Sequence, residues 1–176
     1  AEQMTDDFDL SAPELTREEL LVLEDPYFTP ETVAIVTGAA SGIGRATALC
    51  LAANDLTVVG ADIDEDGLSE TRTIAADLDL PGRIHAIETD LTNDDDVAAV
   101  AEAAADEGDL RFVANIAGMQ HIAGIHEFPM EKYDLLTDIM LRSPFKMAQE
   151  TMPHIRATDD GRGAIANMSS VHGHYA

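Results

Sequence analysis

The sequence has few basic residues. Its 176 residues include 10 Lys and Arg against 34 Asp and Glu, which gives a formal net charge of −24. A surface this acidic repels nucleic acid and anionic membranes, so we expect neither as a partner. Because the acids are spread over every segment, we expect a protein adapted to high salt, where screening relieves the self-repulsion. An acidic protein of an ordinary cytoplasm is the alternative.

The sequence also lacks cysteine pairs and long apolar runs. No run approaches the length that crosses a bilayer, and residues 1–20 do not resemble a secretory signal. The single Cys50 cannot form an intrachain disulfide and is expected to be a small buried apolar residue. These features favour a reduced, cytoplasmic location. The length favours one domain with a sizeable core.

Residues 1–30 differ from the rest of the chain. Thr16 and Glu19 have the spacing of a capping box before an apolar run, which predicts a short helix. Pro26 and Pro30 then interrupt the pattern. We predict an acidic N-terminal arm, which either packs on a neighbouring subunit or remains a frayed extension.

From Thr32 onward, strand and helix patterns alternate. Short apolar runs predict strands at 33–36, 56–61, 83–88, 110–115 and 163–168, and amphipathic patterns predict helices at 42–53, 66–79, 93–107 and 131–153. Asp94, Asp95 and Asp96 fall in a first helical turn, where the helix dipole stabilises acids without any further function. The alternation predicts a three-layer α/β domain over residues 31–176, with a doubly wound parallel sheet.

A glycine-rich turn joins the first predicted strand to the first predicted helix. A bound phosphate needs bare backbone N–H groups, close approach of the backbone and the positive end of a helix dipole. Glycines meet these needs because they carry no Cβ. The expected cofactor-binding residues here are Gly38, Ser41, Gly42, Ile43 and Gly44. Residues 37–44 are therefore predicted to cradle the pyrophosphate of a dinucleotide; a turn without a ligand is the alternative.

Asp62 ends the second predicted strand, 18 residues after Gly44. A carboxylate there accepts hydrogen bonds from the ribose hydroxyls of adenosine and repels a 2′-phosphate. This favours NAD over NADP. A solvated acid at a strand end is the alternative in so acidic a chain.

No metal site is expected. Residues 62–67 open like a calcium-binding loop, but Thr73 stands where that loop requires Glu. The histidines considered as ligands lack ligand spacing on one helix and have no carboxylate–His motif: His121, His126, His154 and His174. They are expected to be ordinary loop or surface residues.

Three further segments resemble an enzyme family when taken with the glycine turn. They follow the third, fourth and fifth predicted strands and read Asp90-Leu91-Thr92, Asn115-Ile116-Ala117-Gly118 and Asn167-Met168-Ser169-Ser170. Over roughly residues 32–176 the chain resembles the short-chain dehydrogenases/reductases, which have a Rossmann-like fold. The resemblance implies that Asp90 contacts the adenine ring beside Leu91, that Asn115, Ala117 and Gly118 line the cofactor site, and that Ser170 is catalytic.

Within that family, residues 118–123, 127–129 and 170–173 resemble the D-3-hydroxybutyrate dehydrogenases. The resemblance implies that Gln120 and His172 hold the substrate carboxylate. Amide and imidazole N–H groups are suitable donors for this purpose. A loop-surface Gln and a strand-end His are the alternatives.

The chain departs from the family in three respects. Ile116 replaces the second Asn of the Asn-Asn-Ala-Gly turn, and Met140 stands where the family places an Asn that holds a relay water. The sequence contains no Tyr-x-x-x-Lys, the pair that moves the hydroxyl proton. We therefore expect a fold truncated after the fifth strand, part of a longer dehydrogenase, which binds NAD but does not turn over.

The leading expectation is an NAD-dependent oxidoreductase that interconverts a small 3-hydroxy acid, such as 3-hydroxybutyrate, and its keto acid. One alternative is a non-catalytic NAD-binding sensor or scaffold, which Met140 favours and Ser170 opposes. Another is a dehydrogenase for a different secondary alcohol. The resemblance also implies a homo-oligomer, a tetramer built through the long helices.

Overall fold

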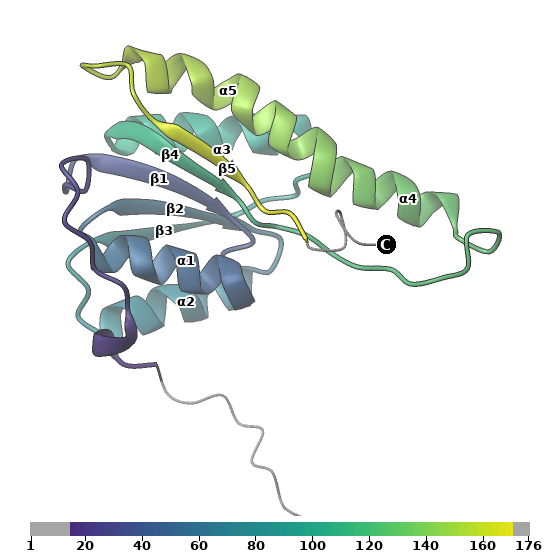
Figure 1. The fold of residues 1–176 in the computed structure, drawn as a ribbon, viewed down its shortest axis with the longest axis horizontal. Helices are drawn as coiled ribbons and strands as arrows, with labels where there is room; N and C mark the ends of the chain where they lie inside the picture. Colours follow the sequence, from purple (N-terminus) through teal and green to yellow (C-terminus); the bar gives the residue numbers. More distant parts are fainter. Residues whose placement is uncertain (1–14, 171–176) are drawn as a thin grey trace, which may run out of the picture.

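The computed structural model describes residues 15–170, in which a parallel sheet lies between two layers of helices (Figure 1). The strands are β1 (Thr32–Thr37), β2 (Thr57–Asp62), β3 (Arg83–Glu88), β4 (Asp109–Asn115) and β5 (Ala164–Asn167). Their order across the sheet is β3-β2-β1-β4-β5, with every neighbouring pair parallel. The predicted Rossmann-like arrangement is confirmed.

The helices cover both faces of this sheet. They are α1 (Gly42–Ala53), α2 (Glu65–Asp77), α3 (Asp94–Glu107), α4 (Met130–Thr137) and α5 (Ser143–Ala157), with a π turn η2 (Asp138–Arg142) between the last two. Helices α1 and α2 lie on one face, and α3 and α5 on the other (Figure 1). Within residues 15–170, none of them combines the length and the apolar character needed to span a membrane.

The central strands are buried on both faces. Successive side chains of a strand point to opposite faces, so Val33 and Ile35 of β1 pack under α3 and α5, while Val36 packs under α1 and α2. All six residues of β1 are buried. Cys50 of α1, which was predicted to be buried, is half-buried against the α1–α2 core.

The predicted single helix at 131–153 is interrupted by η2. Pro144 follows the π turn and has no backbone N–H. The carbonyl of Met140 therefore cannot receive the i+4 hydrogen bond of a regular helix, and Ser143 instead donates to the carbonyl of Asp138, five residues earlier. The π turn thus has a local cause in the sequence.

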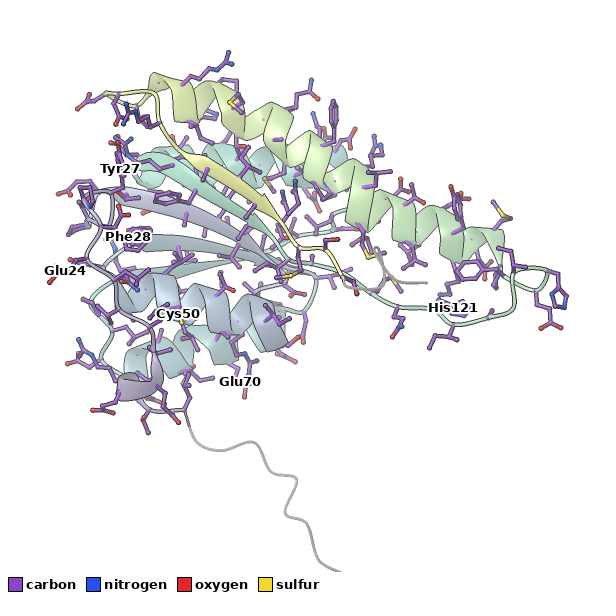
Figure 2. The ribbon with its side chains drawn as sticks, in the orientation of Figure 1. Glu24, Tyr27, Phe28, Cys50, Glu70 and His121 are labelled. Atoms are coloured by element: carbon purple, nitrogen blue, oxygen red, sulfur yellow. The ribbon has the colours of Figure 1, made fainter. Side chains whose placement is uncertain are left out.

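The described part of the predicted arm, residues 15–30, lies against this chain's own domain (Figure 2). The predicted capping box is present, although its helix η1 is only a 3-10 turn (Arg17–Glu19). Leu20 is buried in the α1–α2 core. The Asn54 side chain accepts from the Leu23 N–H and donates to the Leu21 carbonyl, each at 2.7 Å. These contacts fix an otherwise extended segment.

The far end of the arm meets a buried arginine. Arg111 is the extra residue of a β-bulge between β1 and β4, and its guanidinium donates to Asp160 at 2.6 Å. The Tyr27 hydroxyl donates to the same carboxylate at 2.8 Å, and the Tyr27 ring lies 5.3 Å from the guanidinium. Phe28 packs edge-on against Phe112. The arm thus joins the start of β1 to the segment that leads into β5.

We expect Asp160→Asn to reduce the acid sensitivity of the fold. Hydrogen bonds from Arg111 and Tyr27 lower the pKa of Asp160 from 3.8 to about 2. Its contribution to the free energy of unfolding is therefore complete above pH of about 4 and lost as the pH falls towards about 2. In urea unfolding, stability should fall less between about pH 5 and about pH 3 in Asp160→Asn than in the wild type. Asp159→Asn removes a neighbouring exposed acid and serves as the control; equal effects would contradict the prediction.

Candidate functional site

The glycine turn after β1 is held in place by two backbone approaches that leave no room for a side chain. Gly38 has a φ of 74°, and a Cβ built on it would lie 2.9 Å from the Ala117 Cα. A Cβ on Gly44 would lie 1.9 Å from the Gly38 carbonyl oxygen. The turn therefore packs between the start of α1 and the segment after β4 only because both positions are glycine.

The N-terminus of α1 differs from those of α2 and α3. Asp64 caps α2, Asn93 caps α3, and each of these helices has acids in its first turn. Helix α1 follows Ser41, which makes no capping hydrogen bond with its side chain, and its first turn has no acid. In so acidic a chain, this leaves the positive end of the helix dipole without a carboxylate.

Gly42 and Ile43 complete this helix end. Gly42 has a φ of 52°, and a Cβ on it would meet nothing within 4 Å. Ile43 is exposed. Bare N–H groups at an open helix N-terminus form an anion-binding site. The predicted pyrophosphate cradle therefore has the required geometry.

Thr37, at the end of β1, fixes the cradle to the segment after β4, a role that its sequence pattern does not predict. Its buried hydroxyl accepts from the N–H groups of Ile116 and Ala117, at 3.0 and 3.1 Å. The signal was a hydroxyl residue at the last position of a buried strand, directly before the glycine turn. These two hydrogen bonds hold the turn after β4 next to the cradle.

Asp62 lies at the carboxyl end of β2, beside the cradle. Its carboxylate accepts from the Ala40 N–H at 3.0 Å and from the Asp64 N–H at 3.1 Å. Arg45 of α1, also absent from the predicted site, donates to the Ala40 carbonyl and to the Thr71 hydroxyl of α2. Asp62 is thus positioned by backbone donors, and each carboxylate oxygen retains a lone pair for a further donor.

The predicted adenosine-binding residues line one pocket, which we call the Asp62 pocket. It has a volume of about 220 Å³, and its walls include Gly38, Asp62, Asp90, Leu91, Ala117 and Gly118, with Ile139 from η2. Asp90 is held by its neighbours: its carboxylate accepts from the N–H and hydroxyl of Thr92, and its own N–H donates to Asp96. The acidic first turn of α3 therefore also positions Asp90, through the Asp96 carboxylate.

A second and larger pocket, the methionine pocket, adjoins the first through Ala117, Gly118 and Met119. It has a volume of about 560 Å³ and contains the predicted residues Asn115, Gln120 and Ser170. Asn115 donates to the Asn167 side chain at 2.9 Å across β4 and β5. Its own Oδ1 is buried without a partner in the described part of the chain. His172 lies outside the described residues.

Met140 lies where the two pockets meet. A Cβ on Gly118 would be 3.5 Å from the Met140 sulfur. The π turn η2 thus contributes Ile139 to the Asp62 pocket and Met140 to the methionine pocket. Arg142, at the end of η2, makes two hydrogen bonds of 2.6 Å to the Asp94 carboxylate, which anchor the turn to α3. These bonds raise the pKa of Arg142.

Metal ligands do not cluster in residues 15–170, where no three His, Cys, Asp or Glu side chains form a metal-binding group. Asp64, in the segment that resembles a calcium loop, caps α2 instead. His121 packs edge-on against Phe128, and His126 lies 3.9 Å from Glu127. His121 and His126 are thus in contact with side chains of their own loop.

The residues present fit a dinucleotide. The uncapped N-terminus of α1 and the open space over Gly42 suit a pyrophosphate. Asp62 and Asp90 face one pocket on one side of this turn, and Ser170 and Gln120 face the other pocket. All of these groups lie at the carboxyl ends of the strands, where α/β sheets bind ligands.

Comparison with known proteins agrees with this site. The sequence model of the short chain dehydrogenase family matches residues 32–176. The cis-4-hydroxycyclohexanecarboxylate dehydrogenase of Sinomonas cyclohexanicum is 37% identical over 145 residues, which cover 81% of this chain and 56% of that enzyme. The D-beta-hydroxybutyrate dehydrogenase of Cupriavidus necator is 33% identical over 144 residues, covering 80% of this chain and 53% of that enzyme.

Solved structures show the same fold. Carveol dehydrogenase from Mycobacterium avium, in complex with NAD, is similar with a TM-score of 0.75 and 25% identity, covering 82% of this chain and 56% of that one. A metagenomic short-chain oxidoreductase in complex with NADP has a TM-score of 0.74 and 29% identity, covering 81% and 64%. The chain spans about half the length of the curated relatives it matches. On its fold, its glycine turn and these matches, the chain belongs to the short-chain dehydrogenase family.

Proposed function

We propose that this chain supplies the cofactor half of an NAD-dependent oxidoreductase that acts on the secondary alcohol of a small hydroxy acid. The uncapped N-terminus of α1, open at Gly42, is the observation that carries the proposal. Relatives in the family are named for cis-4-hydroxycyclohexanecarboxylate and D-beta-hydroxybutyrate, which both combine a hydroxyl with a carboxylate. The substrate 3-hydroxybutyrate is the simplest candidate of this kind.

The reaction balances as a two-electron oxidation. Bound NAD⁺ would supply the acceptor for the hydride of the carbinol carbon, and the hydroxyl would give its proton to a base, so that the products would be a keto acid, NADH and H⁺. Within this chain, the Ser170 hydroxyl is proposed to hydrogen-bond the reacting oxygen. Gln120 and His172 are proposed to hold the carboxylate through N–H donors.

This sequence does not contain the Tyr-x-x-x-Lys pair with which the family moves the hydroxyl proton. Neither Tyr27 nor Tyr133 has Lys four places later. We therefore propose that residues 1–176 alone bind NAD without turning over. Turnover requires the Tyr and Lys pair, which the family places after the Ser segment.

A non-catalytic sensor of the same fold is the second candidate, and Met140 is the observation that favours it. A thioether cannot replace the Asn amide that the family uses at this position. Ser170, which lines the same pocket as Gln120, favours the enzyme, because a sensor needs no hydroxyl there. NADH formation from a hydroxy acid, by a protein that carries this chain together with Tyr-x-x-x-Lys, distinguishes the two.

The cofactor proposal is tested by two glycine variants. We expect Gly42→Ala to remain folded at a cost of about 1 kcal/mol, since its Cβ enters open space at a positive φ. Its NAD affinity should nevertheless fall, because the methyl group crowds the phosphate-binding N–H groups. Gly44→Ala is the contrasting variant: its Cβ meets the Gly38 carbonyl, so the stability itself should fall by about 1–3 kcal/mol or more.

Calorimetric titration with NAD and thermal unfolding check both variants, at about 1 M KCl because we propose that the acidic surface suits a salt-rich cytoplasm. Unchanged NAD affinity in folded Gly42→Ala would contradict the proposed cradle.

The choice of NAD over NADP is proposed to depend on Asp62. Asp62→Asn keeps an acceptor oxygen for the Ala40 and Asp64 N–H groups but removes the charge that repels a 2′-phosphate. We expect the ratio of NADP to NAD affinity to rise about tenfold, equivalent to about 1.4 kcal/mol. Asp106→Asn, on exposed α3 surface, makes the same change in net charge and should leave the ratio unchanged. If calorimetric titration gives the same ratio of NADP to NAD affinity for Asp62→Asn and Asp106→Asn, this role is refuted.

We propose that copies of the chain associate through α5 and the π turn before it. Phe145 and Met152 of α5 are exposed seven residues apart, which places them on one helical face, and Leu141 of the π turn is exposed just before them. The net charge opposes association at low salt, so the oligomer should form at high ionic strength. Light scattering should show Phe145→Glu as a smaller species, while Leu21→Glu on the arm leaves the mass unchanged. A wild-type monomer at molar salt would exclude this interface.

A further inference from the structure

The methionine pocket has an unusual wall for a site that takes a small acid. Three of the chain's seven methionines, Met119, Met140 and Met168, line it. Each of these side chains is between 37% and 52% exposed. Exposed apolar side chains that converge on one hollow mark a binding surface for apolar groups. Ile116 and Pro144 extend the same wall.

The polar residues that line the pocket are all uncharged: Asn115, Gln120, Asn167, Ser169 and Ser170. In the described part of the chain, no Lys, Arg or His lines it, and no Asp or Glu does. One of the two N–H groups of the Asn115 amide is used by Asn167. The exposed Gln120 amide has no hydrogen-bond partner within residues 15–170 and so remains available to a ligand carboxylate. A neutral amide attracts a carboxylate much less than a cation does.

Beside the Gln120 and His172 donors proposed for the carboxylate, the methionine wall offers apolar contacts to the carbon skeleton of a hydroxy acid. A volume of about 560 Å³ lies within the range of pockets that bury small organic molecules. Methionine side chains are flexible and polarisable, so they adapt to chains or rings of different shape. Because the pocket joins the Asp62 pocket at Ala117 and Gly118, a substrate on this wall lies next to the cofactor side of the site.

We propose that the methionine pocket selects hydroxy acids with a skeleton larger than four carbons, held by Met119, Met140 and Met168, with the carboxylate towards Gln120. This inference rests on the proposed function and specifies its substrate class. In it, Met140 is a specificity-determining residue rather than a lost catalytic one.

The test uses this chain saturated with NAD⁺ and calorimetric titration with 3-hydroxybutyrate, 3-hydroxyhexanoate and 3-hydroxyoctanoate. Burial of each methylene group increases affinity about fourfold, so Kd should fall about fifteenfold for each added pair of carbons. Equal Kd values for the three acids would overturn the inference while leaving the proposed function in place. Failure of NAD⁺ or of all three acids to bind would overturn both.

Variants of equal side-chain length test whether the pocket methionines cause the preference for longer acids. Met140→Gln and Met168→Gln keep the length of the side chain but make it polar, so each should reduce the preference for the eight-carbon acid about tenfold and change 3-hydroxybutyrate binding little. Met130→Gln alters an exposed methionine outside the pocket and is the matched control. If Met130→Gln has the same effect, or if both pocket variants leave the preference intact, the wall does not select the substrate.

Discussion

The site depends on the contact between the Gly44 backbone and the Gly38 carbonyl. This approach, too close for any Cβ, holds the first turn of α1 against the end of β1. The Thr37 hydroxyl then attaches the segment after β4 to the same place. The helix end, the acid at the end of β2 and the turn after β4 thereby occupy fixed positions around one crevice. Without this contact the fold would retain its layers but not its anion-binding end.

Much of this arrangement is predictable from local patterns in the sequence. The apolar run of β1, the glycine spacing of the turn and Asp62 at the next strand end are read directly from the chain, and the alternation of strands and helices predicts a parallel sheet covered on both faces. The capping box at Thr16 and Glu19 is also present as predicted. These features depend on residues within a few positions of one another, which is the range over which sequence patterns are informative.

The features that the sequence did not reveal depend on distant partners. Arg111 and Asp160 look like ordinary charged residues until the β-bulge and the arm bring them together with Tyr27. The acids at the start of α3 were assigned to the helix dipole, whereas Asp94 also holds Arg142 and Asp96 holds the Asp90 loop. The π turn was missed because helical periodicity continues through it, although Pro144 was the local signal.

The π turn also limits how this region can change in length. Each residue of a helix turns the chain by about 100°, and a π turn accommodates one residue more than a regular turn does. Deleting one residue from 138–142 would therefore leave a regular helical turn, with α4 and α5 close to their present orientation. Ile139 and Met140, which reach the two pockets from within the π turn, would be the residues displaced. Insertions and deletions in related sequences should therefore avoid residues 138–142 and collect in the loop before α4.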